Sequence, residues 1–72
     1  MVSGDEMYFK RIAELRTDND KTQKSIADYL RMNVQVYRRY EKGEREIPVW
    51  AIIQLAKFYE VSTDYILGLN KE

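Results

Sequence analysis

The sequence predicts an all-α fold of five short helices, and three observations support this prediction. Apolar residues recur at helical spacing along most of the chain, and no segment alternates apolar and polar residues as a half-buried strand does. Residue types that favour helix ends stand where these periodic segments begin and stop. The chain has 72 residues, which is enough for one small domain with connections of a few residues between its helices.

The first two helices lie in the N-terminal half. A first helix is predicted from Met7 to Thr17, and the turn-forming run Asp18-Asn19-Asp20 ends it. Its inward-facing residues are Tyr8, Ile12 and Leu15, and Phe9 and Ala13 lie beside them. A second helix is predicted from Gln23 to Leu30, because the side chain of Thr22 can cap its first turn. Its inner residues are Ile26, Ala27 and Leu30.

A third helix is predicted between a cap residue and a stop residue. The side-chain oxygen of Asn33 can accept a backbone N–H that would otherwise lack a partner, and Gly43 favours the left-handed conformation that ends a helix. Within this helix Val36, Tyr37 and Tyr40 fall on one side. Gln35, Arg38, Arg39 and Lys42 fall on the other side, which predicts an outward row of one amide and several cations.

Two further helices complete the predicted fold. Pro48 suits the first turn of a fourth helix, Val49 to Tyr59, because its missing N–H costs nothing there. The inner residues of that helix are Ile52, Leu55, Ala56 and Tyr59. Ser62 then caps a short fifth helix from Thr63 to Leu67, which Gly68 stops.

Composition excludes several classes of protein. The chain has no Cys and no His, so it lacks disulfides, thiolate metal sites and the commonest general base. We expect no cofactor, no metal and no enzymatic activity, because phosphate-binding glycine loops and paired acids in a cleft are also missing. The N-terminus does not resemble a signal peptide, and no apolar run approaches the roughly 20 residues that span a bilayer. A cytoplasmic protein without a membrane partner is therefore expected.

Charge is distributed unevenly along a chain whose formal net charge is zero. Between Lys21 and Arg45 seven cations face three anions, and most of the balancing acids lie toward the two ends. This asymmetry predicts one basic face. Residues 1–6 are expected to form a disordered lead-in, residues 7–69 the folded domain and residues 70–72 a frayed tail.

The segment from Thr22 to Gly43 resembles the helix-turn-helix of the phage-repressor (Cro/repressor, XRE-like) family. The residues that carry this resemblance are Thr22, Gln23, Ala27, Leu30, Met32, Asn33, Tyr37, Tyr40, Glu41 and Gly43. Pro48 and the run LAKFYEVSTDYILGL resemble the closing helices of the same family, so the resemblance extends from Tyr8 to Leu69. It implies a compact five-helix, lambda-repressor-like DNA-binding domain with its helix-turn-helix at residues 22–43.

The outward row suits the major groove of B-DNA, which admits one α-helix. Gln35 can pair with adenine, Arg38 or Arg39 with guanine, and Val34 can press on a thymine methyl group. We therefore expect helix 33–42 to enter the groove. The residues expected to contact phosphates are Gln23, Lys24, Asn33, Lys42 and Arg45. For Gln23 this role, together with bracing of the recognition helix, is implied by the resemblance.

The resemblance implies two further contacts. One is an ion pair between Arg16 and Glu41 that would lock the recognition helix to the body of the domain. The other is a homodimer contact at the C-terminal end, for which the candidates are Trp50, Phe58, Ile66, Leu67 and Leu69. A two-fold dimer would match a palindromic operator. For Trp50 and Phe58, enlargement of the core is an equally weighted alternative.

Three positions depart from the family pattern. Asp20, Arg31 and Glu60 stand where glycine is common, and Arg31 raises the question of strain in the turn because non-glycine residues seldom adopt a positive φ. The leading hypothesis is a sequence-specific regulator of transcription, most simply a repressor, that binds double-stranded DNA. Two alternatives remain: an antitoxin-type regulator that also binds a toxin protein, and a protein-interaction module of the same fold without DNA binding.

Overall fold

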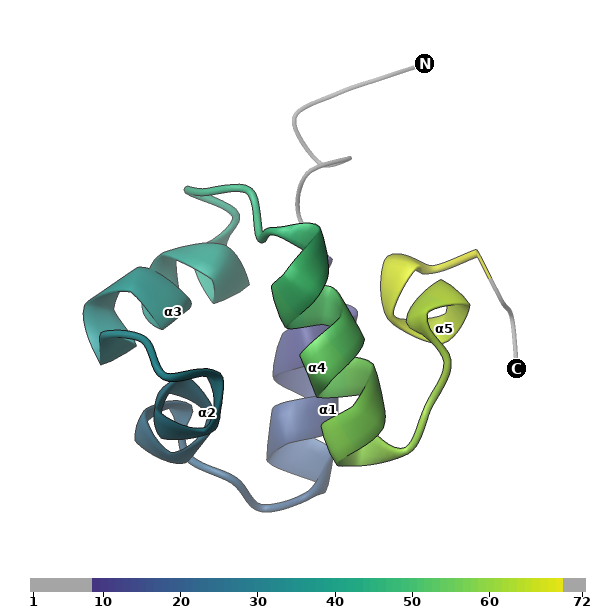
Figure 1. Cartoon of the computed structure of the whole chain (residues 1–72), viewed down its shortest axis with the longest axis horizontal. Helices are drawn as coiled ribbons and strands as arrows, with labels where there is room; N and C mark the ends of the chain where they lie inside the picture. Colours follow the sequence, from purple (N-terminus) through teal and green to yellow (C-terminus); the bar gives the residue numbers. More distant parts are fainter. Residues whose placement is uncertain (1–8, 70–72) are drawn as a thin grey trace.

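A computed structural model of the chain describes residues 9–69, which form five helices and no strand (Figure 1). The helices are α1 (Arg11–Asp18), α2 (Gln23–Leu30), α3 (Val34–Lys42), α4 (Val49–Tyr59) and α5 (Thr63–Leu67). The predicted all-α fold and its number of helices are confirmed over this range. The expected lead-in, the expected tail and the predicted start of the first helix at Met7 and Tyr8 lie outside the described residues.

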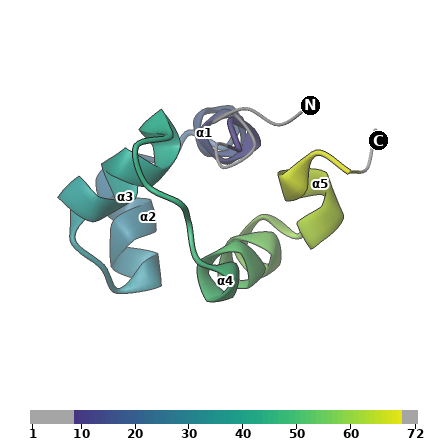
Figure 2. The ribbon, with the colours of Figure 1, turned by 90° about the horizontal axis from the view of Figure 1, so that it is seen from above.

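The helices surround one core. α2 and α3 pack against each other at one end of the molecule, and α5 lies at the other end, where it contacts both α1 and α4 (Figures 1 and 2). Seen from above, α1 and α4 occupy opposite sides between these two ends (Figure 2). Among the helices of residues 9–69, none covers the side of α3 that bears Gln35, Arg38 and Arg39.

The core is built from the predicted inner faces. Its buried apolar residues are Ile12, Leu15, Ile26, Ala27, Leu30, Tyr37, Tyr40, Ile47, Ala51, Ile52, Leu55, Ala56 and Ile66. Ala27 is completely buried, as expected for a small residue where two helices meet closely. Phe9, Met32 and Tyr59 are half-buried and pack against the same cluster. Burial of these faces provides the main favourable term in folding, since short helices are only marginally stable alone.

The three predicted caps are confirmed. The Oγ1 atom of Thr22 accepts the backbone N–H of Ser25 at 3.0 Å, and the Ser25 side chain accepts the N–H of Thr22 in return. The Oδ1 atom of Asn33 accepts the N–H of Gln35 at 2.7 Å. The Oγ atom of Ser62 accepts the N–H of Tyr65 at 3.0 Å. Each cap pairs a backbone donor that the helix itself cannot satisfy.

Two predicted boundaries are corrected. α1 begins at Arg11 and ends at Asp18, one residue beyond the predicted end, because Asn19 still donates its backbone N–H to Leu15 at 3.1 Å. Pro48 precedes α4 as its cap residue, with an extended backbone at φ −73° and ψ 155°, and does not lie inside the first turn. The bounds of α2, α3, α4 and α5 agree with the prediction.

The turn inside the helix-turn-helix keeps its shape without glycine. Arg31 is left-handed, at φ 59°, and the N–H of Met32 reaches the carbonyl of Ala27 at 2.9 Å. This is the bonding pattern that glycine usually supports at a helix end. Asp20 and Glu60 are also left-handed, at φ 57° and 59°. Asp20, Arg31 and Glu60 therefore adopt the conformation that glycine would adopt at these turns. The cost is conformational strain on the order of 1–2 kcal/mol at each position.

Among the described residues, no helix has the length and apolar character needed to cross a bilayer.

Candidate nucleic-acid interface

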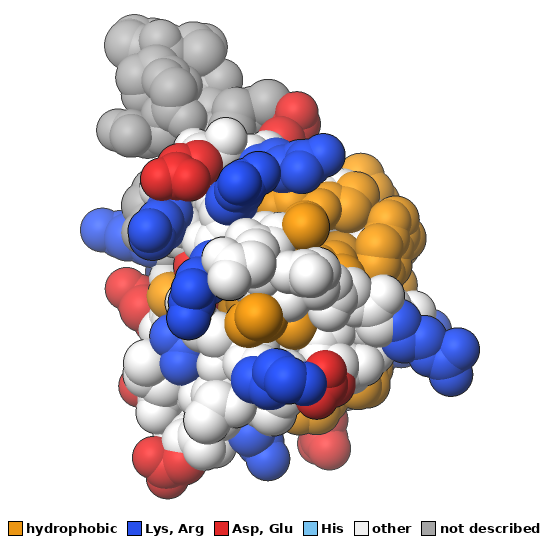
Figure 3. Space-filling view, turned by 90° about the vertical axis from the view of Figure 1, so that its left-hand side faces the viewer, with side chains coloured by type: hydrophobic (Ala, Val, Ile, Leu, Met, Phe, Trp, Pro, Cys, Tyr) orange, Lys and Arg blue, Asp and Glu red, His pale blue; other side chains and the backbone are white. Residues whose placement is uncertain are grey.

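α3 is anchored on one side and free on the other. Tyr37 is completely buried and Tyr40 is 8% exposed, so the aromatic side of the helix faces the core as predicted. Gln35, Arg38 and Arg39 lie on the exposed side. Figure 3 views this end of the molecule, where Lys and Arg side chains are spread among uncharged polar ones and a few acids. The exposed side of α3 is therefore a polar and cationic ridge.

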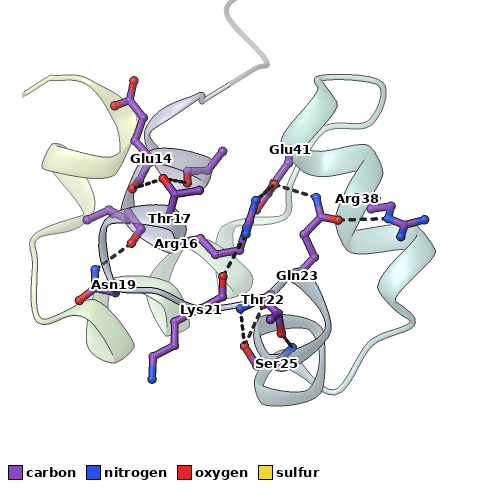
Figure 4. A network of polar contacts seen from close by, with 12 residues as sticks. Glu14, Arg16, Thr17, Asn19, Lys21, Thr22, Gln23, Ser25, Arg38 and Glu41 are labelled. Carbon is purple, nitrogen blue, oxygen red and sulfur yellow. Dashed lines mark hydrogen bonds and ion pairs between the residues drawn. The ribbon is translucent and has the colours of Figure 1, made fainter.

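A polar network fixes α3 against α1 and α2 (Figure 4). Arg16 on α1 donates from Nε to Oε2 of Glu41 at 2.7 Å and from Nη2 to Oε1 at 3.1 Å. Its Nη1 atom donates to the backbone carbonyl of Lys21 at 3.0 Å. The predicted ion pair is thus confirmed in a bidentate geometry, which also ties the α1–α2 connection to α3.

Gln23 continues this network to the surface. Its Nε2 atom donates to Oε1 of Glu41 at 2.9 Å, and its Oε1 atom accepts from Nε of Arg38 at 3.1 Å. The expected bracing by Gln23 is therefore confirmed as contacts with two residues of α3. Its amide already has a protein partner at each end, however, so the direct phosphate contact that the resemblance implied must use the second N–H of the same amide.

Burial and hydrogen bonding have opposite effects on the pKa of Glu41, whose side chain is only 6% exposed. Burial alone would raise the pKa of its carboxyl group, but the hydrogen bonds that Arg16 and Gln23 donate to it outweigh that effect and lower the pKa. The hydrogen bond with Glu41 raises the pKa of Arg16. Both side chains are therefore charged at neutral pH.

Two buried tyrosine hydroxyl groups, those of Tyr37 and Tyr59, lie near the network and have no hydrogen-bond partner within residues 9–69. Burial, together with the negative charge of Glu41, raises the pKa of both, to about 12 for Tyr59. Both phenols therefore stay neutral under ordinary conditions.

The four residues predicted to contact bases differ in their exposure and in their hydrogen bonds. Gln35 and Arg39 are exposed, and their side chains make no hydrogen bond within residues 9–69. Arg38 is also exposed but is held through Nε by Gln23. Val34 differs from the expectation, because it is half-buried and packs against the core. Gln35, Arg38 and Arg39 therefore form the exposed ridge of α3.

The candidate phosphate contacts surround that ridge. Lys42 and Arg45 are exposed at the end of α3 and in the following loop. Lys24 is exposed in the first turn of α2, and its Nζ atom pairs with Asp28 at 2.9 Å. Asn33 uses Oδ1 as a cap, which leaves its amide N–H groups as donors. Arg31, at the end of α2, is a further exposed cation.

The predicted dimer surface is partly wrong. Ile66 is 1% exposed and belongs to the core, so it cannot form a contact surface. Phe58 is half-buried, with its ring centroid 4.6 Å from that of Tyr29, which favours the core role for this residue. Trp50 and Leu69 are 51% and 73% exposed, as a contact surface requires.

Two exposed apolar residues were not predicted from the sequence. Val49 and Ile53 on α4 are 70% and 40% exposed. Together with Leu67 they line a cavity of about 320 Å³ between α4 and α5. The available signal was the almost entirely apolar character of α4, since a helix that is apolar on all sides requires burial on all sides.

Comparison with known proteins identifies a family and several relatives of this chain. A family model described as helix-turn-helix (HTH_3) matches residues 12–66. The chain is 33% identical over 66 residues to the HTH-type transcriptional regulator YobD of Bacillus subtilis (strain 168), covering 92% of this chain and 59% of that protein. It is 36% identical over 62 residues to the HTH-type transcriptional regulator ImmR of the same organism, covering 86% of this chain and 49% of that protein.

A third relative comes from a phage. The cryptic phage CTXphi transcriptional repressor RstR of Vibrio cholerae is 33% identical over 55 residues, covering 76% of this chain and 50% of that protein. The chain therefore spans about half to three fifths of the length of these relatives. No solved structure is significantly similar to it.

Proposed function

This chain belongs to the HTH_3 helix-turn-helix family, and from that premise we propose that it is a sequence-specific, double-stranded DNA-binding regulator of transcription that acts as a repressor. Relatives that match most of this chain are named as transcriptional regulators and, in one case, as a phage repressor. In this proposal α3 enters the major groove. The positive N-terminal end of α2, near Lys24, lies against the DNA backbone.

One observation carries the proposal. The exposed side of α3 presents Gln35, Arg38 and Arg39, whose side chains are suited to base edges, whereas Tyr37 and Tyr40 hold the opposite side in the core. Amide and guanidinium groups can pair bidentately with adenine and guanine, and each such pair contributes about 1–3 kcal/mol of discrimination.

We further propose that the regulator binds as a homodimer to a palindromic operator. Val49, Trp50 and Ile53 expose apolar side chains on α4, next to the cavity that Leu67 also lines. In such a dimer we expect the two α3 helices to lie about 10 base pairs apart, one turn of DNA. Sedimentation of the free protein and of Trp50→Glu tests this: the wild type should dimerise and the variant should remain monomeric.

Selection from a pool of random duplexes tests DNA recognition directly. A symmetric consensus with two half-sites is the expected result, and the affinity for it should fall steeply as salt rises, because phosphate contacts release counterions. Recovery of no consensus, with weak binding that is equal for all duplexes, would contradict the proposal. It would favour instead a protein-interaction module of the same fold.

A further inference from the structure

Gln23 joins two groups with opposite hydrogen-bonding requirements. The carboxylate of Glu41 can only accept hydrogen bonds and the guanidinium of Arg38 can only donate them. An amide can do both, so Gln23 must turn its NH₂ group toward Glu41 and its oxygen toward Arg38, as the distances of 2.9 and 3.1 Å require. The orientation of the amide is therefore determined by its partners, although its oxygen and nitrogen are nearly the same size.

The Glu41 end of this link is rigid. Glu41 is buried and receives both Nε and Nη2 of Arg16, so its Oε1 atom has little freedom to move. Gln23 therefore transmits a fixed position from the interior to Arg38. Figure 4 shows the sequence of contacts, from Arg16 through Glu41 and Gln23 to Arg38 at the surface.

This contact determines which donors Arg38 has left. Its Nε–H group is occupied by Gln23, so the donors that remain are the N–H groups on Nη1 and Nη2. These two nitrogens form the end of the guanidinium plane and present a parallel pair of donors. Such a pair matches the O6 and N7 acceptors of guanine in the major groove.

We propose that Gln23 is a positioning residue for base recognition: by holding Nε of Arg38, it directs the Nη1 and Nη2 atoms of that arginine toward a guanine. The inference rests on the proposed function. It distinguishes Arg38 from its neighbour Arg39, which is exposed without such a partner on the described part of the chain. Arg38 is ordered before DNA arrives, whereas Arg39 must be ordered upon binding.

The test compares base preferences selected from random duplexes by the wild type, Gln23→Met, Arg38→Met and the double variant. Methionine keeps the length of glutamine and replaces the aliphatic part of arginine, and in both cases it removes the side chain's hydrogen bonds. Arg38→Met should lose the preference for guanine at one base pair of each half-site, by roughly 5- to 150-fold. Gln23→Met should lose preference at that same base pair, and the double variant should lose no more than Arg38→Met. Retention of the guanine preference by Gln23→Met would overturn the inference.

Two controls separate this inference from other effects. Arg39→Met should change the preference at a different base pair from Arg38→Met. If Gln23→Met instead lost preference at every base pair, including the one that depends on Arg39, the effect would not pass through Arg38 and the positioning role would be contradicted. If the wild type itself selects no consensus, the proposed function fails, and that result is recognised before any variant is compared.

A second measurement needs neither DNA nor a variant. In the free wild-type protein, NMR should show slower solvent exchange for the Nε proton of Arg38 than for that of Arg39, because only the former is hydrogen-bonded. Equal exchange rates for the two protons would show that Gln23 does not hold Arg38. That outcome would overturn the inference even if Gln23→Met fails to fold.

Discussion

Arg16 and Glu41, 25 positions apart in the sequence, form a two-pronged ion pair in which Nε and Nη2 of the arginine meet both carboxylate oxygens at 2.7 and 3.1 Å. The side chains are only 17% and 6% exposed. Such a pair differs from a surface pair, because removal of one partner leaves a charge that water cannot reach. It also joins α1 to the helix that we propose enters DNA.

We expect Arg16→Met to lower the free energy of unfolding by about 3 kcal/mol, because Glu41 would remain buried without its cation. A domain of this size has a stability of roughly 4–11 kcal/mol, so a large share of it would be lost. Urea denaturation followed by circular dichroism measures the change. Arg39→Met is the matched control and should stay within about 0.5 kcal/mol of the wild type. A loss below about 1 kcal/mol in Arg16→Met would mean that the pair acts as an ordinary surface pair.

The same carboxylate predicts a dependence on pH. The folded-state pKa of Glu41 lies below the ordinary carboxyl value of 4.5, so the unfolded chain takes up the proton more readily than the folded chain. The stabilisation is therefore complete above that ordinary value and is lost as the pH falls through the lower pKa of the folded state. The free-energy difference between wild type and Glu41→Gln should shrink as the pH is lowered from about 6 to about 3. A difference that is constant over this range would contradict the assignment.

Replacement of a left-handed residue by glycine is expected to increase the stability of the fold. Arg31 and Glu60 adopt φ values of 59° at the ends of α2 and α4, and glycine adopts this conformation without steric cost. Glycine also makes the unfolded chain more flexible, which offsets part of the gain, so Arg31→Gly or Glu60→Gly should stabilise the fold by about 0.5–1 kcal/mol. The urea midpoint should rise with an unchanged slope. The same replacement inside a helix, Arg39→Gly, should instead cost about 1 kcal/mol.

Most of the fold could be predicted because helix ends depend on local chemistry. Thr22, Asn33 and Ser62 cap helices through backbone groups two or three positions away, so their role is visible in a short window of sequence. The start of α1 has no side-chain cap, and its predicted boundary extends beyond the described residues. Local signals locate an element best where a cap is present.

The site was less predictable because it depends on contacts between helices. The partners of Gln23 lie 15 and 18 positions away and depend on side-chain conformations that no local pattern encodes. Ile66 was misplaced because α5 has only five residues, which is too short for periodicity to identify its inner face. The Arg16–Glu41 pair was expected only through the family resemblance.

The proposed interface predicts different effects for two exposed arginines. Arg45 lies in the loop after α3 and is proposed to contact phosphate, so Arg45→Ala should weaken binding to all duplexes alike and reduce the slope of log K against log salt by about 1. Arg39 lies on the exposed side of α3. Arg39→Ala should relax the preference at one base pair, with a loss of about 1–3 kcal/mol on the consensus duplex and little change on unrelated duplexes.

Both variants remove the same charge from an exposed arginine, so the comparison isolates position from electrostatics. Fluorescence anisotropy with one consensus duplex and one scrambled duplex, each at several salt concentrations, measures affinity and slope together. The ratio of the two affinities should fall only for Arg39→Ala, because a phosphate contact carries no sequence information. If both variants lowered the two affinities equally, Arg39 would be a backbone contact, and base recognition on α3 would be left to Gln35 and Arg38.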